Sequence, residues 1–88
     1  MFVRSNLIEV GRGPIENYVL NAIVLFNQGY DEICVKGRGE LISKAVDTVN
    51  ALIDRLGDTI KTHKIHIGTE KRGRKILSFI EIWIKRTI

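Results

Sequence analysis

The chain has 88 residues, of which 44% are hydrophobic, and its 14 lysine and arginine residues outnumber its 10 acidic ones to give a net charge of +4. This length supplies one hydrophobic core and excludes a two-domain enzyme, so we expect residues 1–88 to form a single domain. No apolar run approaches the roughly 20 residues of a membrane-spanning helix. The first residues lack the pattern of a secretory signal. The one cysteine, Cys34, has no partner for an intramolecular disulfide, which fits a reducing cytosol.

Residue spacing predicts six elements in chain order. Short β-rich runs at residues 6–10 and 32–36 each precede a segment of helical periodicity, at residues 14–28 and 40–56. Residues 60–69 and 76–85 are rich in β-branched side chains and flank a charged, glycine-containing turn at residues 70–75, which predicts a long hairpin with a bulge near Thr62 and His63. The order β-α-β-α-β-β predicts a two-layer α/β fold, in which two helices pack on one face of a mixed four-stranded sheet that ends in a hairpin arm.

The last predicted strand is apolar on both faces, because Ile80 and Ile82 alternate with Phe79 and Trp83. The two helices cover only one face of the sheet. We therefore expect a second subunit to cover the other face, so that the protein is a dimer.

The positive charge is concentrated near the C-terminus. Residues 1–59 have a net charge of −2, whereas residues 60–88 have a net charge of +6. This asymmetry indicates a polyanionic partner such as nucleic acid, although a basic segment also serves solubility.

Two similar loops, Gly11-Arg12-Gly13 and Gly37-Arg38-Gly39, each lie between a predicted strand and a predicted helix. Parallel strands would bring both loops to one edge of the sheet, where helix N-termini and arginine side chains bind phosphate. Each loop alone also fits a tight turn with a solvated arginine, since neither matches a longer nucleotide-binding motif. The predicted hairpin tip adds a third basic loop, which contains Lys71, Arg72, Arg74 and Lys75. The alternative role of these charges is to keep an exposed hairpin from aggregating.

Three basic loops suit contact with a phosphate backbone and entry of the hairpin arms into a DNA minor groove, and they carry little base-specific information. We expect no catalysis, metal or cofactor, because His63 and His66 are predicted on alternate strand faces and no nucleophile-base pair is recognisable. Cys34 is predicted to be a buried, unreactive thiol. Tyr18 lies one helical turn after the Arg12 loop, where it would either contact a sugar or phosphate or pack in the core.

Four segments resemble the archaeal Alba chromatin proteins, over nearly the whole chain. They are Val10–Leu20, Leu25–Gly29, Ile33–Gly39 and Ile42–Val49. The resemblance implies a cytoplasmic, chromosome-associated dimer that binds and compacts double-stranded DNA, and also binds RNA, without sequence specificity. The nucleic-acid-binding residues that it implies are Gly11, Arg12, Gly13, Asn17, Tyr18, Lys36, Arg38, Gly39, Ser43, Lys44, Lys71, Arg72, Arg74 and Lys75.

The chain also departs from the family pattern. Arg12 and Gly13 stand where members carry paired lysines, and Glu40 stands where many have arginine. Leu56 replaces a phenylalanine that joins neighbouring dimers, which marks it as the dimer-dimer contact. These changes resemble a second paralogue, and they imply heterodimers as well as homodimers. An RNA-binding protein, a ribonucleoprotein subunit, or a partner that modulates a paralogue's DNA binding are the alternatives to a DNA-compacting protein.

Overall fold

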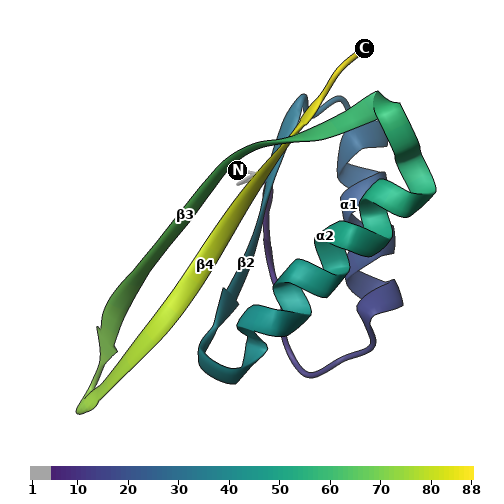
Figure 1. The fold of residues 1–88 in the computed structure, drawn as a ribbon. Coiled ribbons are helices and arrows are strands. Elements are labelled where there is room, and N and C mark those ends of the chain that lie inside the picture. The colour runs from purple at the N-terminus through teal and green to yellow at the C-terminus, as the bar shows by residue number, and fades with distance from the viewer. Residues whose placement is uncertain (1–4) are drawn as a thin grey trace, which may run out of the picture.

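Two helices cover one face of a four-stranded sheet, and a long hairpin projects beyond them (Figure 1). The structure is a computed structural model and describes residues 5–88. Short 3-10 turns precede and follow the second helix, at Gly39–Leu41 and Gly57–Thr59. The elements are β1 (Leu7–Glu9), α1 (Ile15–Asn27), β2 (Glu32–Arg38), α2 (Ile42–Leu56), β3 (Ile60–Arg72) and β4 (Lys75–Arg86).

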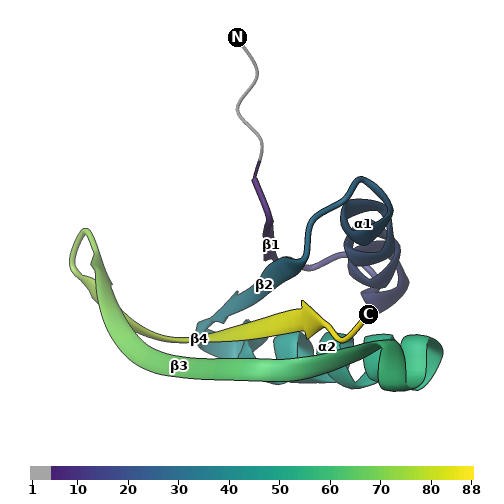
Figure 2. The same cartoon turned by 90° about the horizontal axis from the view of Figure 1, so that it is seen from above.

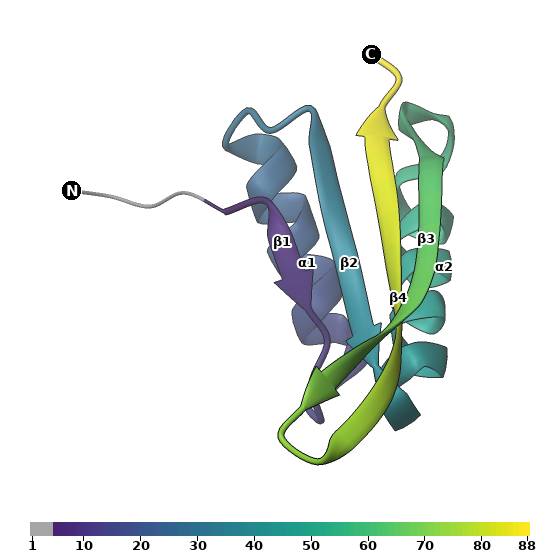
Figure 3. The same ribbon diagram turned by 90° about the vertical axis from the view of Figure 1, so that its left-hand side faces the viewer.

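The strands lie in the order β1-β2-β4-β3, with β1 parallel to β2 and with β4 antiparallel to both β2 and β3. This arrangement confirms the predicted mixed sheet, with both helices behind it (Figure 3). Since β1 and β2 are parallel, the segments that follow them leave the sheet at the same end, as predicted.

The core lies between the helices and the central strands. Ile33 of β2 pairs with Ile84 of β4, and Val35 pairs with Ile82, so four branched side chains face the helices together. Burying each such side chain contributes about 1.5–3 kcal/mol. The helical side of the core is supplied by Val19, Ala22, Phe26, Ala45, Val49 and Leu52.

Within residues 5–88, neither helix is long and apolar enough to cross a membrane.

The second glycine-arginine segment and the hairpin tip differ in detail from the prediction, whereas Gly11-Arg12-Gly13 is a loop as predicted. Gly37 and Arg38 are the last residues of β2 rather than part of a loop. The predicted six-residue turn at 70–75 is a turn of two residues, Gly73 and Arg74, and the strands continue on either side of it. Gly73 has a φ of +61°, which suits the first central position of a tight hairpin turn.

The bulge is where the sequence predicted it, as a register shift between Thr62 and Lys64. It changes which face of the sheet the histidines reach. Both side chains contact carboxylates of the helix-free face, His63 at Glu32 and His66 at Glu81, so their expected placement on alternate faces is wrong. An extra residue in one strand reverses the alternation beyond it.

Within the hairpin, the exposed large apolar side chains lie on the helix side, whereas a second subunit was expected on the helix-free face. On the helix-free face, Phe79 and Trp83 are half-buried, with the ammonium groups of Lys36 and Lys64 over their rings. On the other side, the hairpin exposes most of Ile65, Ile67 and Ile76. The outer part of the hairpin bends away from the helices (Figure 2).

Replacing Gly37 with alanine tests the close approach of β2 to α2. A Cβ atom there would lie 2.5 Å from the carbonyl oxygen of Leu41 and 2.8 Å from the Cβ of Ala45. We expect Gly37→Ala to lower the free energy of unfolding by about 1–3 kcal/mol in urea titrations. Ser78→Ala, at an exposed position of β4, should change it by less than about 0.5 kcal/mol. Equal stability of both variants would contradict this packing.

Candidate nucleic-acid interface

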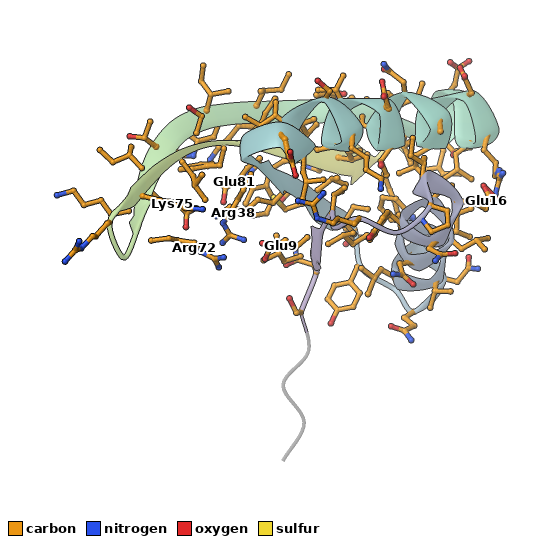
Figure 4. The ribbon with its side chains drawn as sticks, turned by 90° about the horizontal axis from the view of Figure 1, so that it is seen from below. Glu9, Glu16, Arg38, Arg72, Lys75 and Glu81 are labelled. Atoms are coloured by element: carbon orange, nitrogen blue, oxygen red, sulfur yellow. The ribbon has the colours of Figure 1, made fainter. Side chains whose placement is uncertain are left out.

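The loop after β1, the turn after β2 and the hairpin border a common groove of about 480 Å³. We call it the loop-hairpin groove. Figure 4 shows Arg72 and Lys75 extending from the hairpin into the space beside Arg38 and Glu9, while Glu16 lies far from it. The groove is lined by Glu9, Arg12, Arg38, Gly39, Glu40, Leu41, Arg72, Lys75 and Leu77.

The hairpin contributes two of its four tip cations to this groove. Arg72 and Lys75 are a register pair at the ends of β3 and β4, so their side chains lie on the same face of the hairpin. Lys71 is one position further back, on the opposite face, and Arg74 is in the turn. Only Arg72 and Lys75 of the four predicted tip residues line the groove.

Tyr18 contacts the backbone of the first loop. Its hydroxyl oxygen accepts a hydrogen bond of 3.1 Å from the backbone N–H of Gly13. A Cβ atom on Gly11 or Gly13 would lie 3.1 Å from that oxygen, so glycine lets the loop close over the tyrosine. The ammonium group of Lys44, in the first turn of α2, lies 5.7 Å from the centre of the same ring. Tyr18 therefore ties the starts of both helices together.

Neither helix has a side-chain cap at its start, and of the two only α2 begins beside the groove, which Leu41 lines. Pro14 precedes α1, and Leu41 precedes α2 at the end of the 3-10 turn that starts at Gly39. Uncapped backbone N–H groups at a helix start carry partial positive charge and bind anions. The first turns of the helices also expose the polar side chains of Asn17 and Ser43.

The two predicted phosphate-binding arginines already contact carboxylates. Arg12 pairs with Glu40, and both side chains are largely exposed. Arg38 pairs with Glu9, and its Nε donates a hydrogen bond of 3.0 Å to Glu70, which leaves its side chain 16% exposed. Of the two arginines, Arg12 is therefore accessible to a ligand, whereas the side chain of Arg38 is mostly buried.

Lys36 belongs to a row of alternating charges that crosses the helix-free face. Glu9 pairs in register with Lys36, Lys36 with Glu81, and Glu81 with His66. The Nζ of Lys36 lies 3.6 Å from a carboxylate oxygen of Glu81 and 3.2 Å from one of Glu70. Lys36 was predicted as a phosphate ligand, but in the structure its ammonium group lies between two carboxylates.

Glu81 of this row and the neighbouring Glu70 both have a lowered pKa, so they stay ionised to a lower pH than an ordinary carboxylate. The hydrogen bond from His66 lowers the pKa of Glu81, assisted by the positive charge of Lys36. Hydrogen bonds from Arg38 and Lys36 likewise lower the pKa of Glu70. Partial desolvation opposes both shifts but is outweighed.

Two other predicted features lie outside the groove. Burial raises the pKa of the Cys34 thiol to about 11, so the residue is the unreactive thiol that the sequence predicted. Leu56, at the far end of α2, lines a separate, largely apolar hollow of about 180 Å³ with Ile23, Phe26 and Ile60 among its neighbours. Across residues 5–88, no three histidine, cysteine or acidic side chains gather as a metal site requires.

Sequence reasoning missed the acidic members of the site, Glu9, Glu40 and Glu70. Their signal lies in strand pairing, because Glu9, the last residue of β1, pairs in register with Lys36, two residues before the end of β2. Reading that signal requires the pairing of β1 with β2 and of β3 with β4, which no local pattern in the sequence provides.

Comparison with known proteins identifies similar chains. Residues 6–69 match the model of the Alba family. The "DNA/RNA-binding protein Alba 2" of Saccharolobus solfataricus is 50% identical over 72 residues, which cover 82% of this chain and 81% of that protein. The "DNA/RNA-binding protein Alba" of Methanocella arvoryzae is 43% identical over 87 residues, which cover 93% and 91%.

A solved structure has the same fold. "Alba from Thermoplasma volcanium" superposes with a TM-score of 0.82 at 36% sequence identity, over 91% of this chain and 99% of that one. The region matched by the family model ends before the turn of the hairpin.

The charged row predicts a specific loss of stability in acid. A carboxylate with a lowered pKa stabilises the fold above the ordinary value of 4.5, and this contribution disappears as the pH falls through its lower pKa in the folded protein. We expect Glu81→Gln to be less stable than the original protein by about 1 kcal/mol at pH 7, and the difference to shrink below pH 4.5.

Urea titrations across this pH range measure the effect. Asp54→Asn is the matched control, because Asp54 is an exposed carboxylate on α2 that forms no ion pair within residues 5–88. A stability difference for Glu81→Gln that does not change with pH would contradict the role assigned to the carboxylate.

Proposed function

Because the chain belongs to the Alba family, we propose that it binds double-stranded DNA without sequence specificity and compacts it as a chromosome-associated dimer. The observation that carries this proposal is the gathering of basic side chains from three separate segments around the loop-hairpin groove. Phosphate contacts from such side chains fix a protein on nucleic acid without reading its sequence.

The groove offers several points of attachment to one phosphate backbone. Arg12 comes from the first loop, while Arg72 and Lys75 come from the hairpin, which extends beyond the body of the protein (Figure 2). The uncapped start of α2 borders the same groove, because Leu41 lines it. In this proposal the helix starts and the loops hold the backbone, and the hairpin follows the adjacent minor groove. Lys71 and Arg74, the other two predicted ligands of the hairpin tip, would contact phosphates further along the arm.

RNA is a second candidate ligand on the same surface. The relatives in Saccharolobus and Methanocella are both named as DNA/RNA-binding proteins. Phosphate contacts are common to both polymers, so we propose that one groove serves both. Competition between duplex DNA and structured RNA at fixed salt measures the preference.

A second copy of the chain is proposed to cover the exposed apolar side of the hairpin. A hollow of about 410 Å³ on this side is lined by apolar residues from α2 and both hairpin strands, among them Ile42, Ile67 and Ile80. Neighbouring Ile65 and Val46 are also exposed. Contiguous exposed apolar surface of this kind is typical of a subunit interface. The same surface would serve a heterodimer with a second family member.

Salt dependence tests the binding function directly. With roughly six phosphate contacts, the affinity for duplex DNA should fall about a thousandfold between 50 and 200 mM salt, equally for two unrelated sequences. Fluorescence anisotropy over a salt series measures this. An affinity insensitive to salt would overturn the proposal.

Arg72→Ala should weaken duplex binding roughly three- to tenfold and reduce the slope of log affinity against log salt by about 0.9, because one phosphate contact is lost. Lys61→Ala removes the same charge from the other end of β3 and serves as the control. If the two variants bind equally well, the hairpin end of the groove is not a contact surface.

Ile67→Glu should convert the dimer into a monomer, since it places a charge where the proposal buries an apolar side chain. Ile67 is 71% exposed in the single chain, so the monomer should accept the substitution and keep its circular dichroism spectrum. Val24→Glu, at a half-exposed apolar position of α1, is the control and should stay dimeric. Native mass spectrometry and light scattering at micromolar concentration measure the outcome, and a monomeric original protein would refute the dimer.

A further inference from the structure

The ion pair between Arg12 and Glu40 joins the two loops that border the groove. Arg12 belongs to the loop after β1, and Glu40 belongs to the 3-10 turn between β2 and α2, so the contact spans 28 residues of sequence. The side chain of Arg12 is 82% exposed and that of Glu40 is 66% exposed. An ion pair this exposed is weak, because water solvates both charges well, and it exchanges easily for another partner.

Arg38 has a different environment from Arg12 although it occupies the equivalent place in the second glycine-arginine segment. Two carboxylates, Glu9 and Glu70, contact it, and it is mostly buried. Releasing Arg38 to a ligand would leave both carboxylates without their cation. Of the two arginines, Arg12 is therefore the one that a phosphate can take from its carboxylate at small cost.

The backbone keeps Glu40 at the border of the groove when Arg12 changes partner. It follows Gly39, which has a φ of +56°, and it lies two residues before the first residue of α2. The backbone around it is thus fixed by the end of β2 on one side and by a helix on the other. A phosphate that pairs with Arg12 would have this carboxylate as a neighbour.

We propose that Glu40 is an internal counter-ion of Arg12 that limits how tightly the loop-hairpin groove holds a phosphate backbone. In the unbound protein, Glu40 neutralises Arg12 and stands in the place of a phosphate. On binding, Arg12 leaves Glu40 for the ligand, and the carboxylate then repels the bound phosphate. This inference rests on the proposed nucleic-acid binding, and it assigns to an acidic residue the weakening of that binding.

Two physical consequences follow from the exchange. Removing the carboxylate abolishes the competing ion pair and the repulsion, so the affinity for nucleic acid rises. Arg12 would also enter the complex as a fully uncompensated cation, so the release of counterions from the nucleic acid increases. The original protein therefore combines lower affinity with a flatter salt dependence than its number of basic residues suggests.

The test is the affinity of Glu40→Gln for a duplex of random sequence, measured by fluorescence anisotropy over a salt series. Glutamine keeps the size of the side chain and removes its charge. We expect binding about two- to fivefold tighter than that of the original protein, and a salt slope steeper by up to about 0.9. Asp54→Asn is the matched control, because it makes the same change of net charge at the other end of α2.

A double-mutant cycle with Arg12→Ala separates action through Arg12 from a general effect of charge. In the Arg12→Ala background, the advantage of Glu40→Gln over Asp54→Asn should shrink, because the competing ion pair is already gone and only the repulsion between the carboxylate and the phosphate is left to remove. The inference is overturned if Glu40→Gln and Asp54→Asn bind equally well, or if the gain from Glu40→Gln persists undiminished without Arg12.

The outcome for the original protein keeps this inference distinct from the function on which it rests. If the original protein binds the duplex but Glu40→Gln brings no gain over the control, the counter-ion role fails and the proposed function stands. If the original protein binds no duplex at any salt concentration, the proposed function fails and the inference fails with it. Circular dichroism of each variant confirms that it is folded, as the exposure of both side chains leads us to expect.

Discussion

The antiparallel pairing of β4 with β2 on one side and β3 on the other is the constraint on which the rest of the structure depends. Its register places Ile82 and Ile84 beneath the helices and turns Glu81 toward the helix-free face. The pairing with β2 ends at Phe79, opposite Arg38, so the remainder of β4 pairs with β3 alone. The hairpin therefore leaves the body of the protein beside the end of β2, which is where the two loops meet.

Charge pairing then decides which cations of the chain face a ligand. A net charge of +4 suggests a modest general excess, but Lys36 and Arg38 are occupied by carboxylates on the helix-free face. Arg72 and Lys75 project into the loop-hairpin groove from the arm. The protein thus contains mostly buried cations held by carboxylates, Lys36 and Arg38, and exposed cations at the groove, and burial is what distinguishes them.

Local patterns predicted much of the fold. Apolar residues at helical spacing located both helices to within a few residues, and the break in alternation located the bulge at Thr62. The patterns failed where pairing overrides local preference. Gly37 and Arg38 resemble a loop, yet the partner strand extends β2 through both of them. The charged segment at 70–75 likewise resembles a long turn, but strand pairing continues until Gly73. A glycine or a charge signals a turn only when no neighbouring strand offers hydrogen bonds to the backbone.

The sequence by itself determined the order of the elements, the two-layer fold and the basic character of the loops and the hairpin, because these follow from periodicity and composition. Tertiary structure alone decided that Arg12 and Glu40, which are 28 residues apart, form a pair, and that Arg72 and Lys75 face the same groove as both loops. Tertiary structure also decided which side of the hairpin is apolar and exposed. The physical reason is strand register, which sets the face of every side chain and depends on partners that are distant in the chain.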